Sequence, residues 1–192
     1  FKDPRSGLDV DISLDNRLAI HNSMMLKSYA QEERLQRLIQ MVKYWASRRG
    51  INNAFDGTLS SYAWTLLSIQ HAQLVQPPLA PNRQMDADSN PLTFKGTTYD
   101  VGYNDEHYAT ENNQSLASLL ISFFERFATR WDWENMVVSV RSGEALSTKA
   151  KKWEHTGPLP LEVVTGADDG WMEHVMPIED PFNHEHDLSR VV

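Results

Sequence analysis

Two aspartates near the start of the chain are the first residues whose types and spacing could do chemistry. The segment 8–12 alternates apolar residues with Asp9 and Asp11, which is the period-two pattern of a β-strand with one apolar and one polar face. Asp9 and Asp11 therefore share a face, and carboxylates are suited to holding a divalent cation. For an isolated aspartate, the more ordinary interpretation is an exposed strand residue.

His184, Glu185 and His186 form a second group with chemical potential, near the end of the chain. Their spacing lacks the further ligands that a closed transition-metal site needs, so we do not favour such a site. The sequence contains no Cys, which excludes disulfides and thiolate-ligated metals. The remaining isolated histidines are interpreted as surface or hydrogen-bonding residues; among them are His71, His107 and His155.

The elements that must position these residues are mostly helical, because apolar side chains recur at helical spacing over long stretches. The pattern predicts two helices over 16–47 with a polar break at 31–33, helices over 60–74 and 116–131, a loop with short extended pieces over 76–113, and a strand over 136–140. We expect the second helix to end near Gly50, and Pro77 and Pro78 to end the third. This mixture predicts an α+β fold.

Composition excludes several classes of protein. None of the 192 residues belongs to an apolar run approaching the roughly 20 residues of a membrane-spanning helix. A net charge of −8 argues against a protein that coats duplex nucleic acid through its overall field, although a local groove stays open. The basic residues Arg48, Arg49, Lys149, Lys151 and Lys152 are interpreted as solvated surface charges. No targeting segment is recognised at the start, so we expect a cytoplasmic protein.

Short segments spread over nearly the whole chain resemble one family when they are taken in order. They are Asp11 in its strand, 16–22 (NRLAIHN), 42–46 (VKYWA), 57–62 (GTLSSY), 113–116 (NQSL) and 178–182 (IEDPF). This order resembles that of noncanonical poly(A) polymerases and terminal uridylyltransferases, the RNA-tailing branch of the DNA polymerase beta superfamily. The last segments resemble its poly(A)-polymerase-associated domain.

The resemblance also implies what this stretch lacks. Family members carry a Gly-Ser motif and an Asp-x-Asp metal pair upstream of the strand matched here, and neither precedes Asp11. Asp11 therefore resembles the third of three carboxylates that hold two Mg²⁺ (or Mn²⁺) ions. Asp9 and Asp11 are not taken as the first pair, because the helix motif that should follow the third aspartate is present.

The resemblance assigns nucleotide-binding roles to residues of the predicted helices. Asn22 and Ser23 resemble the residues beside the ribose and phosphates, and Lys43 resembles a lysine that meets the triphosphate. A second lysine one turn later is replaced by Ser47, so Arg48 or Arg49 must substitute for it. Ser61 resembles a phosphate contact, and Tyr62 resembles the aromatic residue that stacks on the incoming base. As alternatives from the residues alone, Asn22 could brace its own helix and Tyr62 could be a core aromatic.

The choice of base is assigned by resemblance to the end of the chain. His186 resembles a histidine that contacts the pyrimidine and crowds out a purine, and Asp180 an acidic residue close to the same edge. Asp187 stands where Asn is common, and Asn183 where an acidic residue is found. A carboxylate accepts from the cytosine amine but finds no donor at O4 of uracil. If Asp187 reaches the base edge, CTP should rival UTP; if it points to solvent, UTP should win.

We therefore expect a template-independent RNA 3′-terminal nucleotidyltransferase that uses UTP or CTP and works as a monomer on an RNA 3′ end. Residues 1–15 are expected to supply the C-terminal strand of the catalytic domain, and residues 16–192 the helical central domain with the base-recognising region. Two alternatives stay open: a poly(A) polymerase using ATP, and a noncatalytic RNA-binding scaffold with the same fold.

Overall fold

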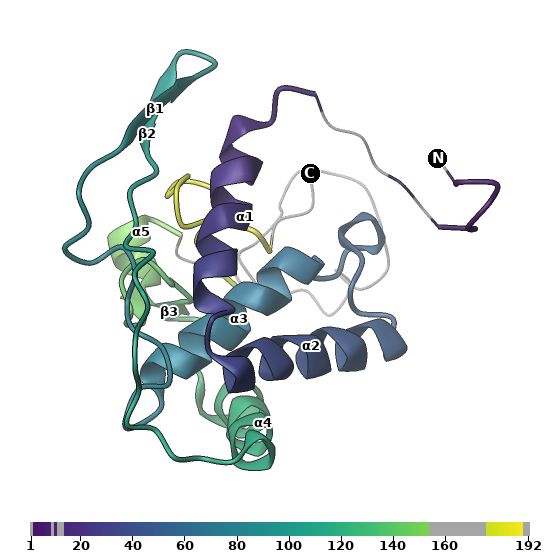
Figure 1. Ribbon diagram of the computed structural model, residues 1–192, viewed down its shortest axis with the longest axis vertical. Helices are drawn as coiled ribbons and strands as arrows, with labels where there is room; N and C mark the ends of the chain where they lie inside the picture. The colour runs from purple at the N-terminus through teal and green to yellow at the C-terminus, as the bar shows by residue number, and fades with distance from the viewer. Residues whose placement is uncertain (1, 9, 11–13, 154–175, 190–192) are drawn as a thin grey trace.

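The computed structural model describes residues 2–8, 10, 14–153 and 176–189, and helices dominate it (Figure 1). The helices are α1 (Arg17–Tyr29), α2 (Glu33–Arg48), α3 (Ser61–Leu74), α4 (Leu116–Glu125) and α5 (Thr148–Lys151), with a 3-10 turn at Ala54–Asp56. Two antiparallel strand pairs join β1 (Pro91–Phe94) to β2 (Thr97–Asp100) and β3 (Met136–Val137) to β4 (Leu146–Ser147). The α+β fold class predicted from the sequence is confirmed.

The first two helices begin and end where the sequence predicts. The side chain of Asn16 caps α1 by accepting a hydrogen bond from the backbone N–H of Ala19, which satisfies one of the free donors at a helix start. The side chain of Glu32 accepts from Arg34 N at the start of α2. Gly50 follows the end of α2 with φ of 68°, a left-handed conformation that glycine adopts without steric cost.

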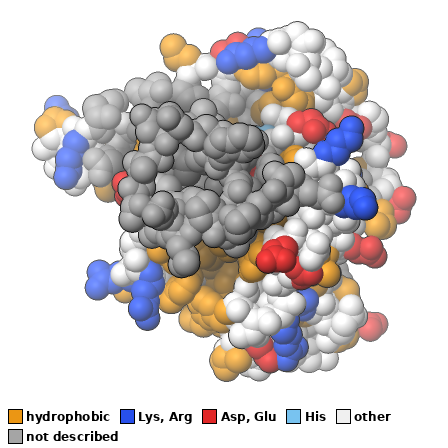
Figure 2. Space-filling view, turned by 180° about the vertical axis from the view of Figure 1, so that it is seen from behind, with side chains coloured by type: hydrophobic (Ala, Val, Ile, Leu, Met, Phe, Trp, Pro, Cys, Tyr) orange, Lys and Arg blue, Asp and Glu red, His pale blue; other side chains and the backbone are white. Residues whose placement is uncertain are grey.

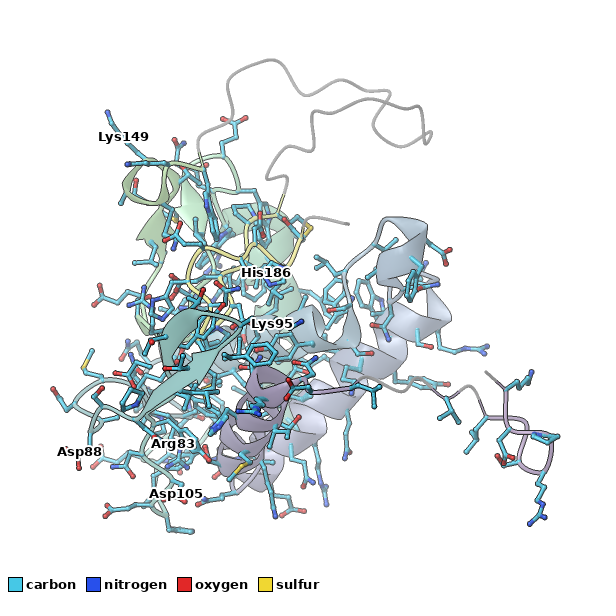
Figure 3. The ribbon with its side chains drawn as sticks, turned by 90° about the horizontal axis from the view of Figure 1, so that it is seen from above. Arg83, Asp88, Lys95, Asp105, Lys149 and His186 are labelled. Atoms are coloured by element: carbon cyan, nitrogen blue, oxygen red, sulfur yellow. The ribbon has the colours of Figure 1, made fainter. Side chains whose placement is uncertain are left out.

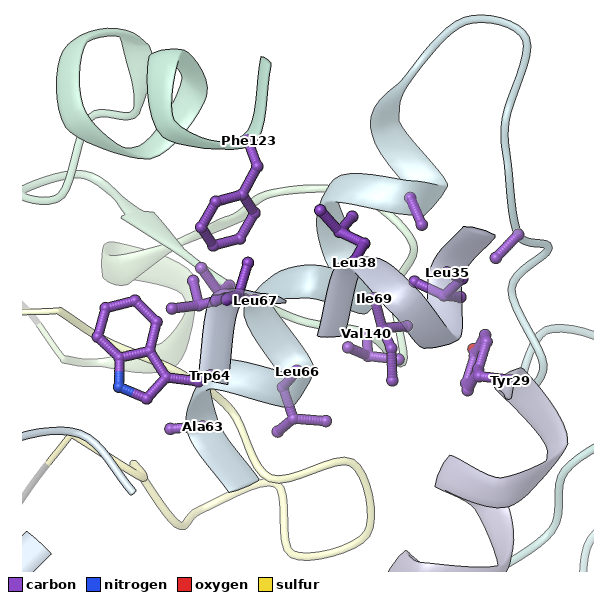
Figure 4. Packing of buried hydrophobic residues seen from close by; sticks show 14 of the residues in the cluster. Tyr29, Leu35, Leu38, Ala63, Trp64, Leu66, Leu67, Ile69, Phe123 and Val140 are labelled. Carbon is purple, nitrogen blue, oxygen red and sulfur yellow. The ribbon is translucent and has the colours of Figure 1, made fainter. Parts of the chain in front are cut away.

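Helix α3 lies at the centre of the molecule, where α1, α2 and α4 surround it (Figure 1), and every residue from Ala63 to Gln73 is buried. The cluster in Figure 4 shows Leu66, Leu67 and Ile69 among side chains from neighbouring elements. A helix that is buried on all sides needs partners for its polar side chains. Most of those of α3 have one: the hydroxyl of Ser68, for example, donates to the carbonyl of Trp64 at 2.9 Å, whereas Gln70 Nε2 and Gln73 Oε1 have no hydrogen-bond partner among the described residues.

The helix predicted over 116–131 has two parts. Helix α4 continues as one π-helical stretch, Arg126–Arg130, whose wider turn changes the direction of the following side chains. Phe123 and Phe127 point into the core and contact each other at a ring-centroid distance of 5.1 Å. Apolar residues of the predicted helix therefore face the core, and the widened turn was not predicted.

The long loop over 76–113 is predicted correctly as a loop with extended pieces, and the β1–β2 hairpin supplies those pieces. Arg83 anchors the loop and is only 1% exposed. Its guanidinium donates to the carbonyls of Ser28 (2.7 Å), Asn104 (2.9 Å) and Glu106 (2.6 Å) and lies 4.7 Å from the ring centroid of Tyr108. No sequence pattern predicted that this arginine would be buried.

The strand predicted over 136–140 is only partly regular. Met136 and Val137 pair with β4, and Val138 forms a parallel bridge with Ile178. The predicted strand over 8–12 contains Asp9 and Asp11, which lie outside the described residues together with 12–13. Among the helices that are described, none is long and apolar enough to cross a membrane.

Candidate nucleotide-binding site

Asp180 is the point at which three predicted site residues meet. One of its carboxylate oxygens, Oδ2, accepts hydrogen bonds from Asn22 Nδ2 and from the Tyr62 hydroxyl, both at 3.3 Å. The other, Oδ1, accepts from the backbone N–H groups of Phe182 (3.0 Å) and Asn183 (2.9 Å). Helix α1, helix α3 and the segment after Ile178 therefore converge on one carboxylate that is 6% exposed.

Backbone pairing places Asp180 at this position. Val138 donates to the carbonyl of Pro177 and Glu179 N donates to the carbonyl of Val138, both at 2.9 Å. Asp180 N then donates to the carbonyl of His186 at 3.1 Å, which closes the turn formed by residues 180–187, here called the base-recognition turn. The turn is thus attached to the strand that follows α4 and has its own closing hydrogen bonds.

Tyr62 stands in the first turn of α3, directly after the cap in which Ser60 Oγ accepts from Ala63 N. Burial raises the pKa of its hydroxyl far above the ordinary value, and the charge of Asp180 and the hydrogen bond to it raise the pKa further. The phenol therefore stays protonated and remains a donor to Asp180. Its ring packs partly against the core, which fixes the ring plane rather than leaving it free to rotate.

Asn22 has one satisfied end and one free end. Its amide nitrogen donates to Asp180, while its Oδ1 is buried and has no hydrogen-bond partner among the described residues. A buried acceptor without a partner is costly. Asn22 therefore keeps an unused acceptor directly beside Asp180.

Ser23, Lys43 and Ser61 are not in direct contact with Asp180. The Ser23 hydroxyl donates to the carbonyl of Ala19 at 2.8 Å in its own helix, and the residue lines a shallow open depression over α1 with Asn16 and Ile20. Ser61 Oγ donates to Asn52 Oδ1 at 3.0 Å. Lys43 is half-buried on α2 and forms no hydrogen bond or ion pair within the described part of the chain.

His186 is exposed, and only its backbone is fixed. Its N–H donates to the carbonyl of Asn183 at 2.8 Å, and its own carbonyl accepts from Asp180. The neighbouring His184 is half-buried; burial and the charge of Arg141 lower its pKa, so it stays neutral near neutral pH.

Asp187 differs from both alternatives that the sequence offered, since it neither points to solvent nor projects its carboxylate as a free acceptor. It is 2% exposed, and Oδ1 accepts from Ile178 N (3.0 Å), Ser189 N (2.9 Å) and Ser189 Oγ (2.9 Å). The carboxylate therefore holds the two sides of the base-recognition turn together. Of the two alternatives, a solvent-facing Asp187 does not match this structure, and its nucleotide-binding role stays a prediction.

Glu179 belongs to the segment 178–182 (IEDPF), and no role was predicted for it. Its buried carboxylate accepts from Arg141, Lys151 and Ser139. In the sequence, the only indication of this role is an acidic residue directly before Asp180. Most acidic residues are exposed, so this indication does not predict a buried one.

The predicted metal ligand, Asp11, lies outside the described residues. Within the ranges that are described, no group of three or more His, Asp or Glu side chains stands close enough to hold a metal ion. The described site thus consists of polar side chains that meet at Asp180.

On the face opposite to Figure 1, acidic and basic side chains are interspersed along the edges beside hydrophobic ones (Figure 2). This mixture agrees with the negative net charge of the chain. Where the side chains of this face are described, the two charges are mixed, unlike the broad basic surface of duplex-coating proteins.

Comparisons with known proteins show which family this chain resembles. Residues 115–186 match the family described as Cid1 family poly A polymerase. Terminal uridylyltransferase cid1 of Schizosaccharomyces pombe is 34% identical over 95% of this chain and 45% of that protein. Poly(A) RNA polymerase GLD2 of Homo sapiens is 32% identical over 95% of this chain and 35% of that protein. The chain thus spans less than half the length of these relatives.

Solved structures of the same family are also similar to this chain. The structure of a cytoplasmic RNA terminal U-transferase superposes with a TM-score of 0.76 and 32% identity, over 93% of this chain and 53% of that one. Cid1 in complex with the UTP analogue UMPNPP gives a TM-score of 0.75 and 32% identity, over 93% and 54% of the two chains.

Proposed function

Because this chain belongs to the Cid1 family of poly(A) polymerases, we propose that it forms the nucleotide-recognising part of an enzyme that adds pyrimidine nucleotides to RNA 3′ ends. UTP is the proposed preferred substrate. This chain covers about half the length of its solved relatives, so the proposed activity is that of the whole protein to which it belongs.

The observation that carries the proposal is the convergence of Asn22, Tyr62 and Asp180 on one another. The three residues come from α1, α3 and the base-recognition turn, and two hydrogen bonds of 3.3 Å to the same Asp180 oxygen join them. A set of polar groups converging from distant segments is typical of ligand sites. The relatives whose structures contain the UTP analogue UMPNPP or the product ApU support a nucleotide as that ligand.

Each group has a chemical part to play with a nucleoside triphosphate. The free Oδ1 of Asn22 accepts from a ribose hydroxyl, and the ring of Tyr62, held at its hydroxyl by Asp180, stacks on the base. The ammonium of Lys43, which has no protein partner in the described ranges, is available for the triphosphate. Ser61 can turn its hydroxyl from Asn52 toward a phosphate oxygen.

The base preference rests on His186 and on the burial of Asp187. An exposed imidazole in the base-recognition turn can donate to O4 of uracil, and its bulk disfavours a purine. Asp187 is occupied by Ile178 and Ser189, so the carboxylate that would select the amine of cytosine is directed elsewhere. UTP is therefore proposed ahead of CTP.

In the proposed reaction the RNA 3′-hydroxyl oxygen bonds to the α-phosphorus of UTP. The bond from that phosphorus to the oxygen bridging the α- and β-phosphates breaks, pyrophosphate leaves, and the hydroxyl proton passes to solvent. Mg²⁺, held in part by Asp11, would favour the attacking oxygen and the leaving pyrophosphate when bound. The described residues contribute by holding the nucleotide in place, which accounts for a large share of catalysis in such transfers.

Adenylyl transfer is the second candidate, and one observation favours it. The GLD2 poly(A) RNA polymerases are nearly as similar to this chain as cid1 is, with 32% against 34% identity for the human protein. A purine preference would mean that the His186 imidazole does not crowd the site.

Primer extension tests the proposal. The full-length protein that contains this chain is incubated with Mg²⁺, a short RNA and each of the four NTPs separately, beside an Asp11→Ala variant. We expect extension with UTP above CTP and ATP, and loss of extension in the variant. Strong use of ATP would favour the second candidate, and no extension with any nucleotide would favour a noncatalytic RNA-binding scaffold.

A further inference from the structure

A buried ionic cluster lies directly behind the nucleotide-facing groups. The side chain of Glu179 is 0% exposed, and its Oε1 accepts from Arg141 Nη2 at 2.9 Å and from Lys151 Nζ at 3.1 Å. The hydroxyl of Ser139 donates to the other oxygen, Oε2. Burial alone raises the pKa of Glu179, but the hydrogen bonds and charge of Arg141, with Ser139 and Lys151, outweigh burial and leave the pKa below its ordinary value.

Lys151 connects this cluster to the base-recognition turn itself. Its ammonium donates to Glu179 and also to the backbone carbonyl of His184, and its side chain is only 11% exposed. Glu179 directly precedes the turn and His184 lies within it. One ammonium therefore bridges the beginning and the middle of the turn that carries Asp180 and His186.

The other side of the cluster is attached to α3. Ser139 N donates to Gln70 Oε1 at 2.7 Å, and Gln73 Nε2 donates to the carbonyl of Val140 at 3.0 Å. Because Tyr62 stands in the first turn of the same helix, the cluster fixes the base-recognition turn relative to the residue that would stack on the base. No member of the cluster contacts Tyr62 or Asn22 directly.

The energetics favour positioning over stability as the use of this cluster. Bringing a carboxylate and an ammonium out of water costs several kcal/mol per ion, so a buried ion pair contributes little net stability compared with an apolar replacement. Such a pair does fix its partners in one geometry, because any movement leaves a buried charge unpaired. The elements fixed here are those that would select the base.

We propose that Glu179 and Lys151 are positioning residues for nucleotide selection, which hold the base-recognition turn against α3 without touching the nucleotide. The inference rests on the proposed function and adds residues to which no role in selection had been assigned. It predicts that discrimination between UTP and ATP depends on an ammonium outside the nucleotide site.

The test compares Lys151→Met with Lys151→Arg in the full-length protein, with Lys149→Met as the matched control. Lys149 lies on the same short helix and projects away from the body (Figure 3), so its replacement should leave activity unchanged. Lys151→Met removes the bridging charge at a helix near the surface. Glu179→Gln, which keeps the size of the buried side chain, is examined in parallel, with exposed Glu144→Gln as its control.

KM and kcat are measured separately for UTP and ATP, together with the melting temperature. For Lys151→Met we expect KM for UTP to rise about tenfold and the ratio of kcat/KM for UTP over ATP to fall about tenfold, which corresponds to about 1.4 kcal/mol. Lys151→Arg should recover most of both, because it keeps the charge. Glu179→Gln should move both quantities in the same direction as Lys151→Met.

The outcomes separate three cases. If the unaltered protein transfers no nucleotide, the proposed function fails before the cluster is tested. If the unaltered protein is active and folded Lys151→Met loses kcat equally for UTP and ATP with KM unchanged, the cluster is only structural and the inference is overturned. If Glu179→Gln does not fold, the comparison of Lys151→Met with Lys151→Arg decides.

Discussion

Two aspartates of the base-recognition turn, Asp180 and Asp187, accept hydrogen bonds from different kinds of donor. Asp180 accepts from side chains that approach from other helices, whereas Asp187 accepts from Ile178 and Ser189, close to it in the sequence. The first arrangement gathers site residues and the second stabilises a turn. In the sequence, Asp180 and Asp187 are both aspartates within or beside the same motif, so only their three-dimensional contacts distinguish their roles.

Asp187→Asn should therefore change stability and leave the choice of nucleotide alone. The amide oxygen can still accept from Ile178 and Ser189, but the substitution removes the charge and replaces Oδ2, which accepts from Ser189 Oγ at 3.0 Å, with an NH₂ donor; weakening these buried hydrogen bonds costs about 1–3 kcal/mol. Urea unfolding measures the stability, and primer extension measures the ratio of UTP to CTP use. A changed ratio with unchanged stability would restore Asp187 as a base contact.

At the scale of elements, helices were predictable because their signal is local. Apolar spacing and the stop at Gly50 gave the bounds of α1 and α2 closely, and Ser60 and Leu74 marked α3. The burial of α3 on all sides was not predictable, since polar residues such as Gln70 find their partners in Ser139, far along the chain. Among the site residues, the grouping of Asn22, Tyr62 and Asp180 agrees with their common assignment, while the contacts of Asp187 depend on a turn that no local pattern encodes.

Arg83 gives a prediction for the loop over 76–113. Its guanidinium reaches three backbone carbonyls at once, and an ammonium is too compact to span them. Arg83→Lys should lower the free energy of unfolding by about 2–4 kcal/mol, because carbonyls are left without donors in a buried place.

Urea unfolding of the chain checks the Arg83 prediction. Arg37→Lys is the control, since Arg37 is 60% exposed and pairs with Glu33 on the surface; its change should stay within about 0.5 kcal/mol. Equal effects of the two substitutions would mean that the loop does not depend on the guanidinium.

At the scale of the whole molecule, stability should depend on pH through His71. Its Nδ1 accepts from Arg126 Nε at 3.1 Å, and its Nε2 lies 3.0 Å from Ser122 Oγ. Burial, followed by the charge of Arg126, lowers its pKa from 6.5 to about 4. Between these values the unfolded chain binds a proton that the folded chain does not, so the stabilisation is complete above pH 6.5 and is lost as the pH falls toward 4.

The expected loss over that range is about 1–3 kcal/mol, measured as the free energy of unfolding at several pH values. His71→Gln should flatten this part of the curve, whereas His107→Gln, at an exposed position, should keep it. A wild-type curve that is level between pH 4 and 6.5 would rule out a neutral buried His71.

The meeting of Asn22 and Tyr62 at Asp180 also bears on how the molecule matures. The two hydrogen bonds join residues 158 and 118 positions apart, and contacts so distant in sequence form late, after the entropy of closing a long loop has been overcome. A chain still emerging from the ribosome without residue 180 has neither acceptor nor base-recognition turn. Partly folded molecules therefore lack the assembled group of Asn22, Tyr62 and Asp180, and the proposed nucleotide site forms only as folding is completed.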